Sequence, residues 1–137
     1  MTTAARWRGV RTPILLAAVA LAAALLLQVR DPHLHGSYGF CPWLALTGTA
    51  CPLCGGLRAV NDLGRGDVVA AASSNLLLVA SLPVLAAVWL RSLAAGWRGR
   101  GSPYDDRTVR LLLLTGVGLT VAFWVVRNLP VSAWLLP

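Results

Sequence analysis

The chain has 137 residues, of which 57% are apolar and only 12% are charged, whereas a soluble domain carries about 25% charged residues. This length predicts a single domain, residues 1–137, and the block-wise apolar residues exclude an ordinary soluble domain in favour of an integral membrane protein. The formal charge of +7 comes from twelve arginines and five aspartates, with no lysine or glutamate. Because the arginines flank the apolar segments, we attribute them to membrane topology and predict no nucleic-acid partner.

Three apolar segments are long enough to cross a bilayer, at about 13–29, 68–90 and 109–126. The first also resembles a signal peptide, but no small-residue cleavage site follows it, which favours an uncleaved helix. The second contains Pro83, which removes a backbone donor and predicts a kink. In the third, Gly116 and Gly118 offer a close-packing surface to a neighbouring helix.

The two connecting loops differ in charge. The loop 91–110 contains five arginines, whereas the three arginines of the loop 30–67 are offset by three aspartates. The positive-inside rule therefore predicts that the N-terminus and the 91–110 loop are cytoplasmic. It also predicts that the 30–67 loop and the C-terminus lie outside.

The 30–67 loop also has structure of its own. Apolar residues recur at helical spacing through 53–63, Gly64 follows as a stop signal, and Asp67 is placed to cap the second span. We expect this short helix to lie on, or dip into, the outer leaflet. Three aromatic residues are expected at headgroup level: Tyr38, Phe40 and Trp43. The predicted fold is all-α, with three transmembrane helices plus a short amphipathic or re-entrant helix between the first and second.

All three cysteines of the chain, Cys41, Cys51 and Cys54, fall in this loop and support three interpretations. The first is a metal site, with zinc held by the three thiolates and a fourth ligand from His33 or His35. The second is thiol chemistry, in which helix amides after the Cys-Pro-Leu-Cys pair lower the pKa of its first thiol. The third is a structural disulfide of Cys41 with either partner, which leaves one cysteine odd.

Five polar residues are expected near membrane depth, where charge is costly unless it is paired or solvated. Arg58 and Asp62 are four residues apart on the predicted short helix and can pair directly. Asn75 can cap that helix or bind backbone within a polar pocket, and Arg127 and Asn128 follow the third span. Together they predict a polar pocket in the outer leaflet, with Arg58 and Arg127 converging on an anionic group.

The order of these residues resembles a bacterial family of small membrane proteins, catalogued as a domain of unknown function. The resemblance rests on the run Thr47–Ala59, which is similar to the family core T-G-x-x-C-P-x-C-G-x-T-R-A, and on the run 127–130, which is similar to R-N-x-P. It covers residues 31–130, and Leu57 departs from it by replacing the usual threonine. The resemblance implies a multi-pass protein of the bacterial cytoplasmic membrane and no known reaction.

We therefore expect a non-enzymatic membrane subunit or scaffold whose Cys-containing element binds a partner, a lipid or a metal. No residue is assigned a catalytic role, and zinc is the cofactor considered. The alternative is a membrane thiol-redox or metal-dependent enzyme that uses Cys51 and Cys54. The bilayer is the expected environment, together with self-association or another membrane protein.

Overall fold

The computed structural model describes residues 3–34, 37–39 and 41–129 of the chain. These residues form five helices: α1 (Thr3–Val29), α2 (Pro42–Thr47), α3 (Gly56–Gly64), α4 (Val68–Trp97) and α5 (Asp106–Arg127). Three of them, α1, α4 and α5, are long and apolar enough to cross a membrane. The predicted all-α fold with three candidate spans is therefore confirmed.

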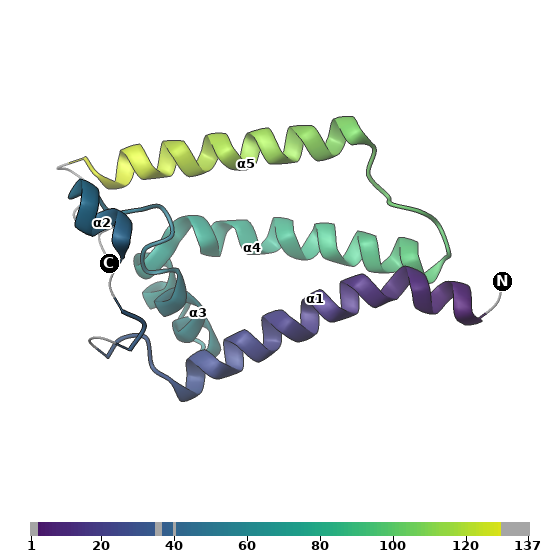
Figure 1. Cartoon of the computed structure of the whole chain (residues 1–137), viewed down its shortest axis with the longest axis horizontal. Helices are drawn as coiled ribbons and strands as arrows, with labels where there is room; N and C mark the ends of the chain where they lie inside the picture. The colour runs from purple at the N-terminus through teal and green to yellow at the C-terminus, as the bar shows by residue number, and fades with distance from the viewer. Residues whose placement is uncertain (1–2, 35–36, 40, 130–137) are drawn as a thin grey trace.

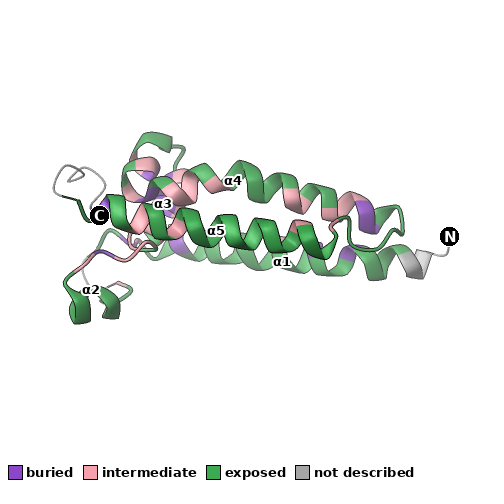
Figure 2. Ribbon diagram, turned by 90° about the horizontal axis from the view of Figure 1, so that it is seen from above, coloured by how far each residue is buried: buried purple, intermediate pink, exposed green. Residues whose placement is uncertain are grey.

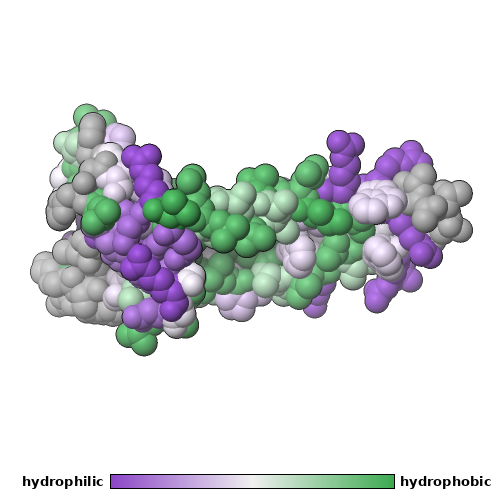
Figure 3. All heavy atoms as spheres, turned by 90° about the horizontal axis from the view of Figure 1, so that it is seen from below, coloured by the Kyte–Doolittle hydropathy of each residue, from purple (hydrophilic) through white to green (hydrophobic). Residues whose placement is uncertain are grey.

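The three long helices extend in the same general direction, and the short elements gather at one end (Figure 1). We call the end that carries α2, α3 and residues 50–55 the Cys end. The opposite end, with the start of α1 and the 98–105 connection, is the basic end. A space-filling view shows hydrophilic residues at both ends with an apolar zone between them, as a protein that crosses a bilayer requires (Figure 3).

Helices α1 and α4 approach most closely at the basic end. A Cβ atom built on Gly9 would lie 2.7 Å from the carbonyl oxygen of Gly96, so only glycine allows this backbone contact. Nearby, Trp89 Nε1 donates to the carbonyl of Pro13 at 2.9 Å. From there the two helices diverge toward the Cys end, where α3 lies between them and packs against both (Figure 1).

Helix α5 is held mainly at its ends. It does not pack along α1, α3 or α4 as those three pack on one another. At the basic end the connection to α4 is tied by Tyr104, whose hydroxyl donates to the Val88 carbonyl at 3.3 Å. Cβ atoms built on Gly116 and Gly118 would meet no atom within 4 Å, so the surface predicted to pack against a neighbouring helix is open within this chain.

Three local features differ from the sequence prediction. Helix α3 begins at Gly56 rather than at residue 53, because Gly55 adopts a left-handed conformation (φ 80°) that separates it from the preceding turn. The additional helix α2 was not predicted; proline stands at its start, and Gly48 (φ 69°) ends it by donating to the Leu44 carbonyl. Finally, the backbone of α4 departs from helical angles at Asn75 (φ −159°, ψ 92°), not at Pro83.

Burial is concentrated where the elements meet rather than along the spans (Figure 2). The apolar side chains that are buried are few and mostly small. By contrast, four polar residues at the Cys end are buried: Asn61, Asp62, Asn75 and Arg127. The Cys end is therefore ordered by polar contacts, which is unusual for a chain so rich in leucine and alanine.

Candidate functional site

The three cysteines lie close together at the Cys end, although Cys41 precedes Cys51 by ten residues in the sequence. Cys41 precedes α2, and Cys51 and Cys54 lie in the turn before α3. The Sγ atoms of Cys41 and Cys51 are 3.6 Å apart, and those of Cys51 and Cys54 are 2.9 Å apart. All three sulfur atoms lie within 4.8 Å of one another, and all three thiols are free.

The backbone around these cysteines, residues 50–55, is the Cys loop, and Asn75 binds it from α4. The Asn75 amide donates to the carbonyls of Pro52 (2.9 Å) and Cys54 (3.2 Å). Its Oδ1 accepts from the backbone amide of Leu78 at 3.0 Å, so Asn75 also caps the part of α4 that follows the break. The interruption of α4 at this residue is thus what turns an amide side chain onto the Cys loop.

Arg127 binds the same loop from the last residue of α5. Its guanidinium donates to the carbonyls of Cys54 (2.7 Å) and Cys51 (3.3 Å), and to the Ser74 carbonyl at 3.4 Å. The side chain is fully buried, and its Nε atom has no hydrogen-bond partner. The ring of Phe123, one turn earlier on α5, lies 5.5 Å from the guanidinium carbon.

Asn128 completes the attachment of the loop. It pairs with Ala50 in both directions, accepting from the Ala50 amide at 2.9 Å and donating to the Ala50 carbonyl at 3.0 Å. The rings of Trp43 on α2 and Trp124 on α5 also pack edge to face, with their centroids 6.0 Å apart. Side chains from α4 and α5 therefore fix the loop backbone on several sides.

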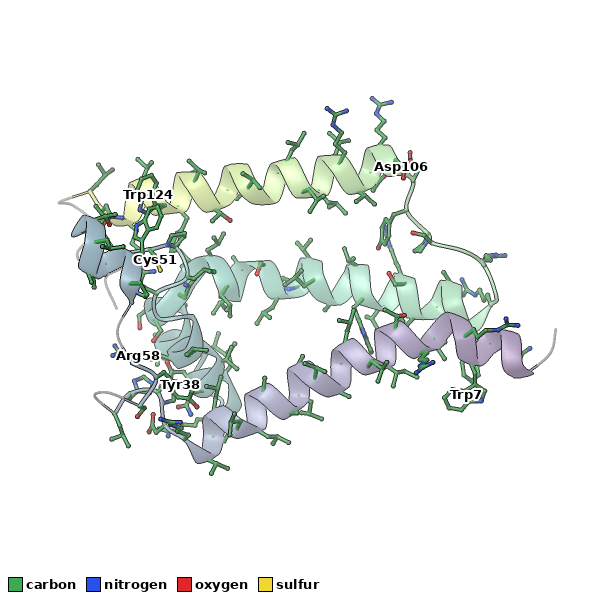
Figure 4. All side chains as sticks on the ribbon, in the orientation of Figure 1. Trp7, Tyr38, Cys51, Arg58, Asp106 and Trp124 are labelled. Atoms are coloured by element: carbon green, nitrogen blue, oxygen red, sulfur yellow. The ribbon has the colours of Figure 1, made fainter. Side chains whose placement is uncertain are left out.

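A cavity of about 400 Å³ opens beside the cluster, and all three cysteines line it. Tyr38 and Arg58 contribute its polar rim, and Leu44, Leu53 and Leu57 contribute apolar wall. Cys51, Arg58 and Tyr38 accordingly appear at the same end of the molecule in Figure 4. A ligand that reached the sulfur atoms would pass a guanidinium and a phenol.

The surroundings of the three thiols give them different acidities. The backbone amide of Leu44, at the start of α2, lowers the pKa of the Cys41 thiol, and the Cys54 thiol contributes to the same shift. Burial raises the pKa of the Cys54 thiol to about 12, and hydrogen bonding with Cys51 and Cys41 adds to it. The Cys-Pro-Leu-Cys pair does not stand at the start of a helix as the sequence predicted, since α3 begins only after Gly55. Of these two thiols, Cys41 is therefore the more readily deprotonated, whereas Cys54 keeps its proton.

Two other predicted site residues, His33 and Asp62, belong to a second polar cluster, where α3 meets the end of α1. His33 Nε2 lies 2.8 Å from Asp62 Oδ1, and Ser74 donates to the second carboxylate oxygen at 3.0 Å. Asp62 therefore has these partners in place of the predicted Arg58, whose Nε points to the Pro32 carbonyl at 3.5 Å. Among the described residues the potential metal-ligand cluster contains only cysteines, without His33. His35 and Phe40 lie outside the described residues.

The sequence analysis did not predict three further polar contacts of this second cluster. Asn61 donates to the Leu27 carbonyl at 2.7 Å, and Gln28 donates to the Asn61 carbonyl at 3.1 Å. Arg65 forms an ion pair with Asp31 at 2.8 Å. The backbone amide of His33, followed by Arg65, lowers the pKa of Asp31. Isolated amides in a sequence give little indication of which distant carbonyl they will bind, so these contacts had no usable sequence signal.

Part of the chain is similar to a known protein family. Residues 41–89 match the model described as "Protein of unknown function (DUF2752)". The segment contains the three cysteines, α2, α3 and most of α4, so the resemblance to a domain of unknown function is confirmed for this part of the chain. No curated protein and no solved structure matches the chain.

Proposed function

We propose that this chain is a membrane protein that binds one soft metal ion through Cys41, Cys51 and Cys54. The observation that carries the proposal is the convergence of three sulfur atoms within 4.8 Å on a backbone fixed by two other helices. Thiolate ligands select ions such as Zn²⁺ and Cu⁺. Three sulfur ligands leave the fourth position of a zinc centre for a group from the cavity, such as water or a ligand supplied by a partner.

The distances between the sulfur atoms fit a metal centre after a small adjustment. Zinc–sulfur bonds of about 2.3 Å in tetrahedral geometry imply sulfur atoms about 3.8 Å apart. Cys41 and Cys51 are already 3.6 Å apart, whereas Cys51 and Cys54 at 2.9 Å must separate by rotation of a side chain. Asn75, Arg127 and Asn128 bind backbone atoms of the loop rather than sulfur atoms, so the thiolates remain available to a metal.

The charge of Arg127 favours a metal over a disulfide. This guanidinium is fully buried and, among the described residues, has no carboxylate partner. A buried cation without compensation is costly. Three thiolates around Zn²⁺ carry a net charge of −1, and around Cu⁺ a net charge of −2, and either would offset the guanidinium that binds their own backbone. A disulfide is neutral and would provide no such compensation.

Metal analysis of the purified full-length chain tests the proposal. We expect about one equivalent of bound metal per chain, lost in each of the variants Cys41→Ser, Cys51→Ser and Cys54→Ser. The matched control is His33→Ala, which should retain the metal because His33 is paired with Asp62. Substoichiometric metal in the wild-type chain, together with three freely alkylated thiols, would refute the metal site.

A second candidate function is thiol–disulfide exchange, favoured by the 2.9 Å separation of Cys51 and Cys54. In this version the Cys51 thiolate attacks an external disulfide and releases one thiol, and Cys54 then displaces the second thiol from the mixed disulfide, which leaves a Cys51–Cys54 disulfide. Alkylation before and after reduction separates the two functions. A Cys51–Cys54 disulfide in the protein from native membranes would support exchange, whereas metal-protected thiols would support the first proposal.

For the biological setting we propose a bacterial cytoplasmic membrane, with the N-terminus on the cytoplasmic side and the Cys end outside. The support is the excess of arginine at the basic end. The whole chain acts as one membrane domain and as a subunit of a larger assembly, for which the open face of α5 is available. A phosphatase fused after residue 137 should be active and one inserted at 101 inactive. The reverse result would invert the orientation.

A further inference from the structure

A second cavity lies at the basic end, far from the cysteines. It has a volume of about 300 Å³ and forms between the end of α4 and the connection to α5. Three arginines line it, Arg91, Arg98 and Arg100, together with Ser102 and Pro103. No carboxylate occurs among the described residues of its wall, so the cavity is strongly basic.

These arginines are not needed to complete the end of α4. The last carbonyls of that helix are bound by backbone amides: Arg98 N donates to Ala94 O at 3.1 Å, and Arg100 N donates to Ala95 O at 2.9 Å. Gly99, with φ 64°, provides the left-handed turn that makes this arrangement possible. The three guanidiniums have no ion-pair partner in the part of the chain that the structure describes. Their donors are therefore available to a group outside the chain.

An apolar groove continues from this basic cavity. The groove lies between α1 and α4, has a volume of about 740 Å³, and shares Ala94 and Arg98 with the cavity. Ile14, Ala17 and Leu21 line it from α1, and Leu90 and Trp97 line it from α4. Trp97 is 62% exposed, which suits an aromatic residue at the level of the lipid headgroups. One ligand with an anionic head and an apolar tail would match both surfaces.

We propose that the basic end is a binding site for an anionic phospholipid. The phosphate group binds among Arg91, Arg98 and Arg100, because guanidinium forks match phosphate oxygens in a bidentate manner. One acyl chain lies in the groove between α1 and α4. Free phosphate shares the headgroup chemistry, but it would use only the basic cavity, so the groove distinguishes a lipid from a soluble anion.

Native mass spectrometry of the full-length chain in detergent tests the headgroup site, with phosphatidylglycerol, phosphatidylcholine and inorganic phosphate as separate probes. An arginine that contacts the lipid phosphate is expected to contribute about fivefold to binding, as basic residues at an anionic membrane surface do. The triple variant Arg91→Gln/Arg98→Gln/Arg100→Gln should therefore bind phosphatidylglycerol more than about tenfold more weakly. The matched control, Arg6→Gln/Arg107→Gln/Arg110→Gln, removes the same charge outside the cavity and should change binding less than about twofold. Equal losses in the two variants, or equal binding of phosphatidylcholine, would refute the site.

A second pair of variants tests the groove. Ala17→Trp fills the apolar groove and should weaken phosphatidylglycerol binding several-fold while leaving phosphate binding unchanged. Ala122→Trp, at an exposed position of α5, is the control and should leave both unchanged. If Ala17→Trp binds phosphatidylglycerol as well as the wild-type chain does, the lipid proposal is wrong and the cavity binds a soluble phosphate.

Discussion

Arginine has different surroundings at the two ends of the long helices. At the Cys end, Arg127 is fully buried and donates to the carbonyls of Cys51, Cys54 and Ser74. At the basic end, Arg91, Arg98 and Arg100 are exposed and the nearby carbonyls of α4 are satisfied by the backbone. The first arginine orders the protein itself, whereas the other three are available to a ligand. An arginine therefore has a structural role where nearby backbone carbonyls lack other donors. It is available for binding where backbone amides already satisfy those carbonyls.

The largest effect should follow from removal of the buried arginine. Arg127→Leu deletes three hydrogen bonds from a charged donor and should lower the free energy of unfolding by about 3–5 kcal/mol, with loss of metal binding. Thermal unfolding in detergent, followed by tryptophan fluorescence, measures the change in stability. Arg110→Leu is the control, since Arg110 is exposed on the same helix, and it should change stability by less than about 0.5 kcal/mol. Equal stability of the two variants would show that Arg127 does not hold the Cys loop.

A smaller loss is expected at Asn75, where one side chain has two roles. Asn75→Ala removes the cap on Leu78 and both donors to the Cys loop, and should cost about 2–3 kcal/mol at about 1 kcal/mol for each hydrogen bond. Asn75→Ser restores a capping hydroxyl without the amide donors. It should recover about 1 kcal/mol of stability while its cysteines stay as reactive toward an alkylating reagent as those of the alanine variant. If serine restores wild-type reactivity, then the cap and not the amide orders the loop.

At the basic end, stability should depend on the close backbone contact between α1 and α4 and less on side-chain hydrogen bonds. Gly9→Ala places a methyl group 2.7 Å from the Gly96 carbonyl oxygen and should destabilise the chain by about 1–3 kcal/mol. Gly116→Ala meets no atom within 4 Å and should stabilise α5 by about 0.5–1 kcal/mol. Thermal unfolding of both variants in the same detergent provides the comparison. A stabilising Gly9→Ala would mean that α1 and α4 do not approach closely there.

The smallest effect concerns reactivity within the Cys end and involves no change in fold. In reduced, metal-free protein the lowered pKa of Cys41 should make its alkylation rate level off at a lower pH than is usual for a thiol. The raised pKa of Cys54, about 12, should keep its rate rising throughout the alkaline range that the protein tolerates. Peptide mass spectrometry after iodoacetamide pulses at pH 6 to 10 would measure both rates. Faster labelling of Cys54 than of Cys41 at pH 7 would contradict this order.

The sequence predicted the long elements well because length and apolar content are local properties. Three helices long enough to cross a membrane follow directly from the apolar blocks, and Asp67 does cap α4 by accepting from Ala70. The cysteine cluster was also foreseeable, since all three cysteines lie in one short loop. The helix α2 was missed because six residues with proline and tryptophan carry too little periodicity to indicate a helix.

The partners of the polar residues could not be predicted in the same way. Arg58 and Asp62 have the spacing of a helical ion pair. In the structure, however, the segment that follows α1 places His33 against Asp62 instead. Asn75 was expected to act on the neighbouring helix, and it does reach the Cys loop, but it does so by breaking α4. The close contact of Gly9 with Gly96 joins residues far apart in the sequence and has no local signal. Such contacts depend on how whole helices are placed, which single-residue patterns do not encode.

The divergence of α1 and α4 also has a consequence for the surrounding lipid. These helices touch at the backbone near the basic end and are separated by α3 near the Cys end (Figure 1). Their combined cross-section is therefore tapered, and they occupy more area in the leaflet next to the cysteines than in the opposite leaflet. Lipids around this tapered pair of helices pack with unequal area in the two leaflets, so we expect the chain to be enriched in curved over flat membranes as a consequence of the Gly9–Gly96 contact.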